Sequence, residues 1–176
     1  MNDFMDLVKE RYSCRSFLKA PVEREKIELC LEAARFSPSA RNTQPWFYTI
    51  VEEPETVRRV AACLQREGAN GFTDDAPVFA VVSERKLTGS SIGGAGELQK
   101  FAQFDLGLSV AHFCLEAYNV GLSCCIIGWI DADGLHSACA LPEDDCVRVV
   151  IALGYNNGDS RRPKERFEQA EMSKFI

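Results

Sequence analysis

Apolar residues recur along this chain with two different periods, and each period predicts one kind of element. Helical spacing over Phe4 to Val8 predicts a short first helix, and the same spacing over Ile27 to Phe36 predicts a second helix, opened by Pro21 and acids in its first turn. We expect both helices to pack inward. Continuous apolar runs at Trp46 to Val51 and Val78 to Val82 predict buried strands, with a helix from about Pro54 to Arg66 between them.

The longest periodic segment runs from Leu98 to Val120 and predicts a nearly buried central helix that ends at Gly121. Two further apolar runs, Leu122 to Ile127 and Val147 to Leu153, predict strands on either side of a short helix near Asp131 to Ala138. Helices and strands that alternate in this way predict one layered α+β core.

Composition limits the class of protein. The 176 residues are 46% hydrophobic and 26% charged, which predicts a single domain spanning residues 1–176 with a substantial core. A net charge of -6 argues against nucleic acid as a partner, because such binding needs many contacts from Lys and Arg to phosphates. The first residues, MNDFMDLVKERYS, do not resemble a signal peptide, and no run of about 18 apolar residues occurs. We therefore expect a cytoplasmic protein without a membrane span.

Eight cysteines raise the question of disulfides or a metal. Cys30, Cys63 and Cys114 lie in apolar helical runs, which is typical of reduced thiols that pack as small hydrophobes. Neither a C-x-x-C motif nor a zinc-like spacing of the two histidines occurs, so we predict no metal. The adjacent Cys124 and Cys125 favour ordinary strand packing over a strained mutual disulfide.

Candidate chemistry begins with two basic segments far apart in the sequence, RYSCRSF at Arg11 to Phe17 and RRPKER at Arg161 to Arg166. In an extended backbone Arg11, Ser13 and Arg15 would face one side and present two guanidinium groups and a hydroxyl to one ligand. The alternative for the first segment is a solvated basic turn. Because the protein is acidic overall, we interpret the two segments as halves of a site for a nucleotide-type cofactor.

Two loop-like segments add to this picture. SPSARNTQPW at Ser37 to Trp46 combines turn-forming polar residues with two prolines and predicts a rigid polar loop, which also connects a helix to a strand. LTGSSIGGAGE at Leu87 to Glu97 lacks both the P-loop and the dinucleotide-binding patterns. We interpret it as a mobile surface loop or, if functional, a flexible lip over an active site.

Several motifs in order resemble the nitroreductase family of FMN-dependent oxidoreductases over essentially the whole chain. They are RYSCRSF, AARFSPSARNTQPWFYTIVE, GLSCCIIGW, VIALGYNNG and PKERF. The resemblance implies a nitroreductase-like α+β fold with a central mixed or antiparallel sheet flanked by helices. It also implies a homodimer with FMN at the subunit interface, and electron transfer from NADH or NADPH to a small acceptor such as a nitroaromatic or a quinone.

The resemblance assigns cofactor-binding roles by position. Arg11, Ser13, Lys164 and Arg166 would hold the FMN phosphate, with Tyr12 beside them. Arg15 would approach N1 and O2 of the flavin ring and tune its redox potential. No side chain is expected to be catalytic by itself, because FMN carries the chemistry.

The remaining assignments concern the flavin ring. A loop of the second subunit would lie along the ring with residues Pro38, Ser39, Ala40 and Asn42. The segment that passes over the ring would consist of Cys125, Ile126, Ile127 and Gly128. Asn70 would contact the pyrimidine edge. In the last segment the main chain would make the contacts, and Gly128 would permit a close approach.

Alternatives remain at this stage. The family also includes relatives that dehalogenate aromatic substrates or fragment flavin, and a non-catalytic flavin-binding redox sensor would carry the same binding residues. Apolar residues within the charged segment 157–176 are typical either of an arm that reaches the partner subunit or of a frayed terminus.

Overall fold

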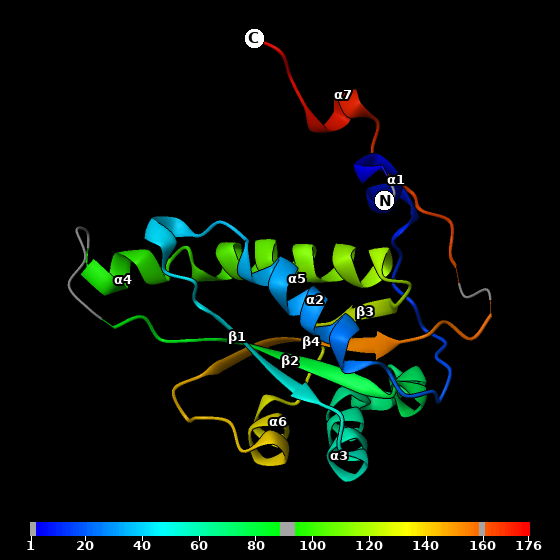
Figure 1. The fold of residues 1–176 in the computed structure, drawn as a ribbon. Coiled ribbons are helices and arrows are strands. Elements are labelled where there is room, and N and C mark those ends of the chain that lie inside the picture. Colours follow the sequence, from blue (N-terminus) through cyan, green and yellow to red (C-terminus); the bar gives the residue numbers. More distant parts are fainter. Residues whose placement is uncertain (1–2, 89–93, 159–160) are drawn as a thin grey trace.

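The computed structural model describes residues 3–88, 94–158 and 161–176 and has an α+β architecture (Figure 1). Its four strands are β1 (Trp46–Val51), β2 (Val78–Glu84), β3 (Ser123–Ile127) and β4 (Cys146–Gly154). They form one sheet in the order β1-β2-β4-β3, and every neighbouring pair is antiparallel. The predicted fold class and all four predicted strands are confirmed.

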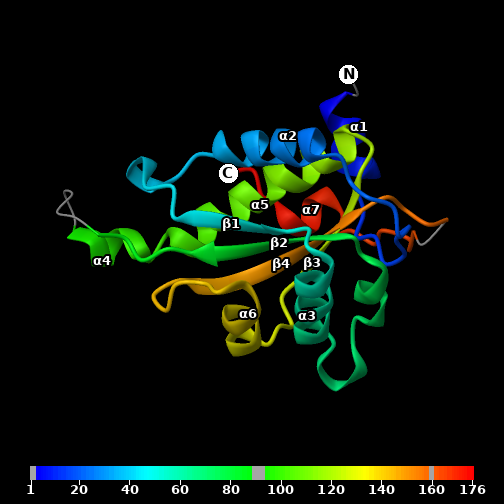
Figure 2. The ribbon, with the colours of Figure 1, turned by 60° about the horizontal axis from the view of Figure 1, so that its bottom comes forward.

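Helices cover both faces of this sheet. Figure 2 shows α2 (Arg24–Arg35) and α5 (Ala102–Asn119) on one face, and α3 (Pro54–Leu64) and α6 (Ala132–Cys139) on the other. The central strand β2 is buried along its whole length, which explains why it reads as a continuous apolar run rather than an alternating one. Alternate side chains of β2 pack into two separate cores. Val81 packs toward α3 and α6, and Val82 packs toward α2 and α5.

Local signals define the helix ends, and those predicted at Pro54 and Gly121 are confirmed. Pro54 begins α3, and the Glu53 side chain accepts hydrogen bonds from the main-chain N–H groups of Glu55 and Thr56. Asp131 caps α6 by accepting from the Gly134 N–H at 3.1 Å. Gly121 follows the C-cap of α5 with a φ of +82°, the left-handed conformation that glycine adopts at little cost.

The long central helix differs from its prediction in two respects. It is divided into α4 (Gly94–Gln99) and α5, and the side chains of Phe101 and Phe104 are 52% and 69% exposed, although they were expected in the core. The reason is geometric, since only one face of α5 packs between the sheet and α2. The prediction for the loop at Leu87 to Glu97 falls partly on residues 89–93, which lie outside the described residues, and from Gly94 onward the chain is helical.

Both chain ends are exposed, and the first of them departs from expectation. The first helix, α1 (Phe4–Glu10), was predicted to pack inward, but none of its residues is buried and Phe4 is 65% exposed. Figure 1 shows α1 near the C-terminal end of α5, on the side of that helix away from the sheet, with the short helix α7 (Gln169–Met172) drawn above it. Residues 161–176 are exposed throughout, including Phe167 and Phe175. In the second helix, α2, Ile27 and Cys30 pack inward as predicted, whereas Phe36 at its end is exposed.

The close packing around Gly154 generates a stability prediction. A Cβ atom on this residue would lie 2.7 Å from Cδ of Pro77 and 3.2 Å from Cδ1 of Phe17, so Gly154→Ala should lower the free energy of unfolding by about 1–3 kcal/mol. Gly71→Ala is the matched control, because a Cβ there meets nothing within 4 Å, and its stability should be unchanged or slightly higher. Urea denaturation of the two variants checks both signs, and equal stability would contradict this view of the packing.

Candidate functional site

The segment Arg11 to Phe17 runs in an extended conformation along the edge of β3. Ser13 forms a parallel bridge with Cys124, and the Cys14 N–H donates to the Cys124 carbonyl oxygen at 2.9 Å. Tyr12 and Cys14 are buried, so the alternating residues Arg11, Ser13 and Arg15 face outward. The predicted arrangement, with all three side chains on one side, is confirmed.

The C-terminal basic segment returns to this row and closes a pocket of about 150 Å³. Its lining consists of Arg11, Tyr12, Ser13, Arg15, Arg162, Pro163, Lys164 and Arg166. We call this the basic pocket. Arg161 donates to Glu10 at 2.9 Å, and the Lys164 ammonium donates to the carbonyl oxygen of Lys9, so two contacts tie the tail to the end of α1.

The structure therefore brings together two segments that are about 150 residues apart in the chain, as the sequence predicted. Arg162 also lines the pocket, although the sequence reasoning selected only Lys164 and Arg166 from the tail. Its signal was present in the RRPKER run. What the sequence could not show is which of these cations turn toward the pocket.

Positive charge in the basic pocket is only partly compensated. The pKa of the Lys164 ammonium is lowered, first because the group is partly desolvated and then because Arg11 and Arg166 repel its charge. Burial raises the pKa of the Tyr12 phenol, so that group stays neutral at physiological pH. An arrangement of several guanidinium groups, an ammonium and the Ser13 hydroxyl suits a phosphate or a similar anion.

The adjoining part of β3 offers a surface for a larger ligand. Cys125 and Ile127 are buried, Ile126 is 44% exposed, and Gly128 just beyond the strand is exposed. Burial raises the pKa of the Cys125 thiol to about 11, and the nearby charge of Arg15 opposes this rise. Arg15 thus lies between the basic pocket and the predicted ring segment. In the part of the chain that the structure describes, no further strand pairs with the outer edge of β3 beyond Cys124.

Two predicted parts of the site are not in the basic pocket. The segment from Pro38 to Asn42, which contains the short helix η1 (Ala40–Asn42), lies near the N-terminal end of α5, whereas the basic pocket lies near its C-terminal end (Figure 1). Asn70 adopts a left-handed turn and its amide nitrogen donates to the carbonyl oxygen of Leu64 at 3.0 Å. Its proposed flavin contact stays a prediction.

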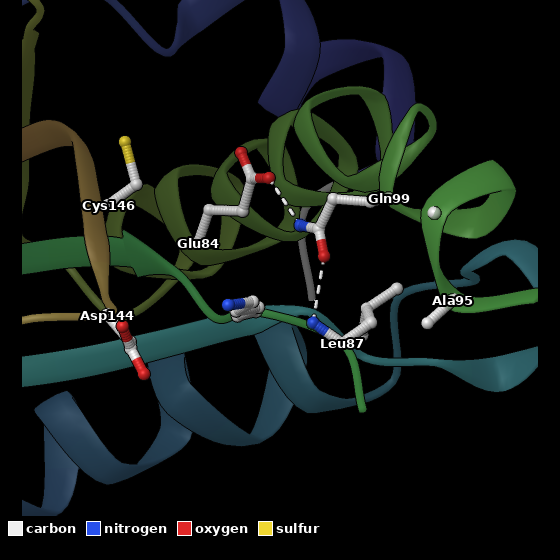
Figure 3. A pocket seen from close by; sticks show the side chains of 8 residues that line it. Glu84, Leu87, Ala95, Gln99, Asp144 and Cys146 are labelled. Carbon is white, nitrogen blue, oxygen red and sulfur yellow. Dashed lines mark hydrogen bonds between the residues drawn. The ribbon is translucent and has the colours of Figure 1, made fainter. Parts of the chain in front are cut away.

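A larger cavity of about 390 Å³ lies beside the end of β2 (Figure 3). Within it the Gln99 side chain donates to Glu84 at 2.5 Å and accepts from the Leu87 N–H at 2.8 Å. The second oxygen of Glu84 pairs with Arg148 at 2.7 Å. Because these polar groups satisfy one another, we interpret the network as a structural link between β2, β4 and α4 and not as a binding site.

Other classes of site are not evident. Within residues 3–88, 94–158 and 161–176, no three His, Cys, Asp or Glu side chains gather as a metal site, and no disulfide forms. No helix in the same ranges is long and apolar enough to cross a bilayer. Cys30 and Cys114 lie in the core as predicted, Cys63 is half-buried, and Cys124 and Cys125 are buried in β3.

Comparison with known proteins establishes the family. The sequence model of the nitroreductase family matches residues 8–69 and 60–155, and the chain belongs to this family. It is 28% identical to the oxygen-insensitive NADPH nitroreductase of Helicobacter acinonychis over an alignment of 194 residues, gaps included, and the alignment covers 90% of this chain and 91% of that protein. The predicted class of enzyme, a nitroreductase-like oxidoreductase, is confirmed.

Two further similarities support this classification. The chain is 34% identical over 76 residues to the nitrobenzene nitroreductase of Ectopseudomonas oleovorans, and the match covers 42% of this chain and 34% of that protein. The chain thus spans about a third of the length of that relative. A crystal structure from Exiguobacterium sibiricum, described as a nitroreductase in complex with FMN, has the same fold, with a TM-score of 0.86 at 19% identity over 100% of this chain and 98% of that one.

The lowered pKa of Lys164 gives a prediction for anion binding. Sulfate, whose charge is constant near and above neutral pH, should bind more weakly as pH rises through the pKa of Lys164, which lies below that of an ordinary lysine. Lys164→Arg should abolish this decline, because arginine keeps its charge over that range. Isothermal titration across this range checks the effect. Lys100→Ala, which removes an exposed lysine paired with Glu97 on α4, is the control and should bind sulfate like the unchanged protein.

Proposed function

We propose that this protein is an FMN-dependent oxidoreductase that uses NADH or NADPH to reduce a small acceptor, such as a nitroaromatic or a quinone. The observation that carries the proposal is the basic pocket, where Arg11, Ser13 and Arg15 meet the cations of the C-terminal segment. The FMN in the complex from Exiguobacterium sibiricum and the NADPH in the name of the Helicobacter relative support the choice of cofactor and donor.

The pocket residues fit the phosphate of FMN. Arg11 and Lys164 would bind the phosphate oxygens as cations, Arg166 would add a further positive charge, and the Ser13 hydroxyl would donate a hydrogen bond. Bound phosphate would supply negative charge to balance these cations, which the protein itself balances only in part. It would also favour the protonated form of Lys164, whose pKa is lowered first by partial desolvation and then by the charges of Arg11 and Arg166.

Arg15 and β3 would hold the flavin ring. When bound, FMN would supply the redox chemistry, accepting hydride from the nicotinamide at N5 and passing electrons to the acceptor. Arg15 would place a fixed cation beside N1 and O2, where it favours the reduced, negatively charged form. The main chain of the Cys125 to Gly128 segment would donate hydrogen bonds at the N5 edge, and the absence of a side chain on Gly128 would allow a close approach.

A second subunit would complete the site. The Pro38 to Asn42 segment and the basic pocket lie near opposite ends of α5, whose 18 residues extend about 27 Å. A single flavin in the pocket would therefore contact this segment only from another copy of the chain. Exposed Phe101 and Phe104 near the N-terminal end of α5, together with exposed Phe36 at the end of α2, provide apolar surface for such an interface.

The proposal predicts a specific role for Arg15. Arg15→Ala should raise the dissociation constant of FMN about tenfold or slow reduction of the bound flavin by NADH or NADPH, because a charged hydrogen-bonding group contributes about 1.5–3 kcal/mol. Arg24→Ala, which removes an exposed arginine paired with Glu28 on α2, should change neither property. The measurement is visible absorbance during titration with FMN and then, without oxygen, with each nicotinamide. Equal effects of the two substitutions would contradict the assignment.

The same titration of the unchanged protein tests the function itself. Flavin bands that bleach on addition of NADH or NADPH support a nicotinamide-dependent reductase. Bound flavin that stays oxidised would replace the proposal with a non-catalytic flavin-binding module. A protein that binds no FMN would overturn both.

The exposed tail predicts a contribution to the dimer. Phe167, Met172 and Phe175 are apolar and have almost no cover from their own chain, so we expect them to pack on the partner subunit. Deleting residues 167–176 should weaken the dimer, measured as a shift toward monomer in light scattering across a dilution series. An unchanged dimer would show that the tail takes no part in assembly.

A further inference from the structure

The helix α5 carries a polar stripe inside an otherwise apolar environment. Asp105, Ser109 and His112 are spaced by four and three residues, which places them on one face of the helix. Asp105 is only 3% exposed and Ser109 is fully buried. Polar residues in such positions need partners, and all three find them in the connection between α2 and β1 or in the two elements that it joins.

Each member of the stripe holds a different part of that connection. The Ser109 hydroxyl lies 3.3 Å from the carbonyl oxygen of Ala34 in the last turn of α2 and 2.8 Å from the Tyr48 hydroxyl on β1. The Nδ1 atom of His112 shares a hydrogen bond of 2.8 Å with the hydroxyl of Ser37, which is also buried. These contacts fix the two ends of the connection.

Asp105 holds the middle of the connection. Its Oδ2 atom accepts a hydrogen bond from the main-chain N–H of Ala40 at 3.0 Å. Within the described part of the chain, Asp105 takes part in no ion pair. A buried carboxylate without a cation is costly to keep, which makes this one hydrogen bond to the loop its most evident role.

The loop needs such an anchor because its backbone is strained. Arg41, Asn42 and Gln44 have φ values of +53°, +58° and +47°, a left-handed conformation that costs residues with side chains free energy. Local hydrogen bonds, such as that from the Gln44 N–H to the Ser39 hydroxyl at 3.0 Å, support this shape from inside the loop. The contact with Asp105 ties it to the rigid body of the protein.

We infer that Asp105 is a positioning residue of the flavin site, which holds the Pro38 to Asn42 segment in the conformation that contacts the cofactor. The part of this inference that concerns contact with the flavin rests on the proposed function. The part that concerns how Asp105 holds the loop does not. Asp105 itself would touch neither flavin nor substrate. It would act through the main chain of Ala40 from a helix that also packs on the sheet.

Trypsin provides a test of the loop that needs no cofactor, because Arg41 is an exposed cleavage site at its centre. Asp105→Ala should speed cleavage after Arg41 about tenfold or more, followed as the 1–41 fragment by mass spectrometry under native conditions. Asp105→Asn should restore near-normal resistance, because the amide oxygen still accepts from Ala40. If Asp105→Ala does not fold, Asp105→Ser, whose side chain is too short to reach the loop, takes its place.

The matched control removes another buried acid. Asp145 is 9% exposed and precedes β4, which β2 separates from β1 and the loop before it, so Asp145→Ala should leave cleavage after Arg41 unchanged. Equal acceleration in both variants would show general destabilisation and overturn the inference. Unchanged cleavage in Asp105→Ala would overturn it as well.

The second readout concerns the flavin. The FMN dissociation constant should rise about tenfold in Asp105→Ala and return close to normal in Asp105→Asn. Faster cleavage with unchanged FMN affinity and unchanged flavin reduction would show that Asp105 holds a loop with no role at the cofactor, and would overturn the inference. If the unchanged protein bound no FMN, the proposed function would fail with the flavin part, while the cleavage assay would still decide whether Asp105 holds the loop.

Discussion

Main-chain pairing between the Arg11 to Phe17 segment and β3 is the constraint on which the functional half of the molecule depends. The hydrogen bond from Cys14 to Cys124 fixes the register of an extended segment whose side chains alternate between two sides. Burial of Tyr12 and Cys14 then determines that Arg11, Ser13 and Arg15 face outward. A shift of one residue would bury two guanidinium groups, so the core indirectly specifies the position of the cations.

The same register makes the basic pocket a site that is ready for an anion. The tail is held at the end of α1 by the contact between Arg161 and Glu10, and Arg161 also lies over the Tyr12 ring, 5.0 Å from its centre. These contacts keep several like charges close together, and the pKa of Lys164 is lowered, first by partial desolvation and then by repulsion from Arg11 and Arg166. An anion would relieve that repulsion, which links the local structure to the proposed binding of the FMN phosphate.

Helix α5 has two structural tasks. Its apolar face packs on the sheet and on α2, while its polar stripe holds the connection that leads into β1. Its length also separates the strained loop from the basic pocket. A rigid element of this kind would let one subunit bind the phosphate while presenting its loop to the flavin of the other, so the geometry of the helix connects the fold to the proposed dimer.

Much of this protein follows from the sequence alone, because the signals concerned are local. Strand periodicity, the start of α3 at Pro54, the end of α5 at Gly121 and the alternation from Arg11 to Arg15 depend on neighbouring residues, and the structure agrees with each. The meeting of the two basic segments was also foreseen, from their unusual charge in an acidic chain.

Only the tertiary structure decided which surfaces face one another. Apolar residues in α1 and at Phe104 fit the helical period as well as any core residue, yet they stay exposed because no element among the described residues covers them. Arg162 lines the basic pocket with residues of the Arg11 to Arg15 segment, which is distant in the sequence. Asp105 accepts a hydrogen bond from Ala40, which is also distant in the sequence, and Asp105 belongs to no motif that the sequence reveals. Periodicity specifies which side of an element is apolar, whereas the partner of each side depends on how the whole chain packs.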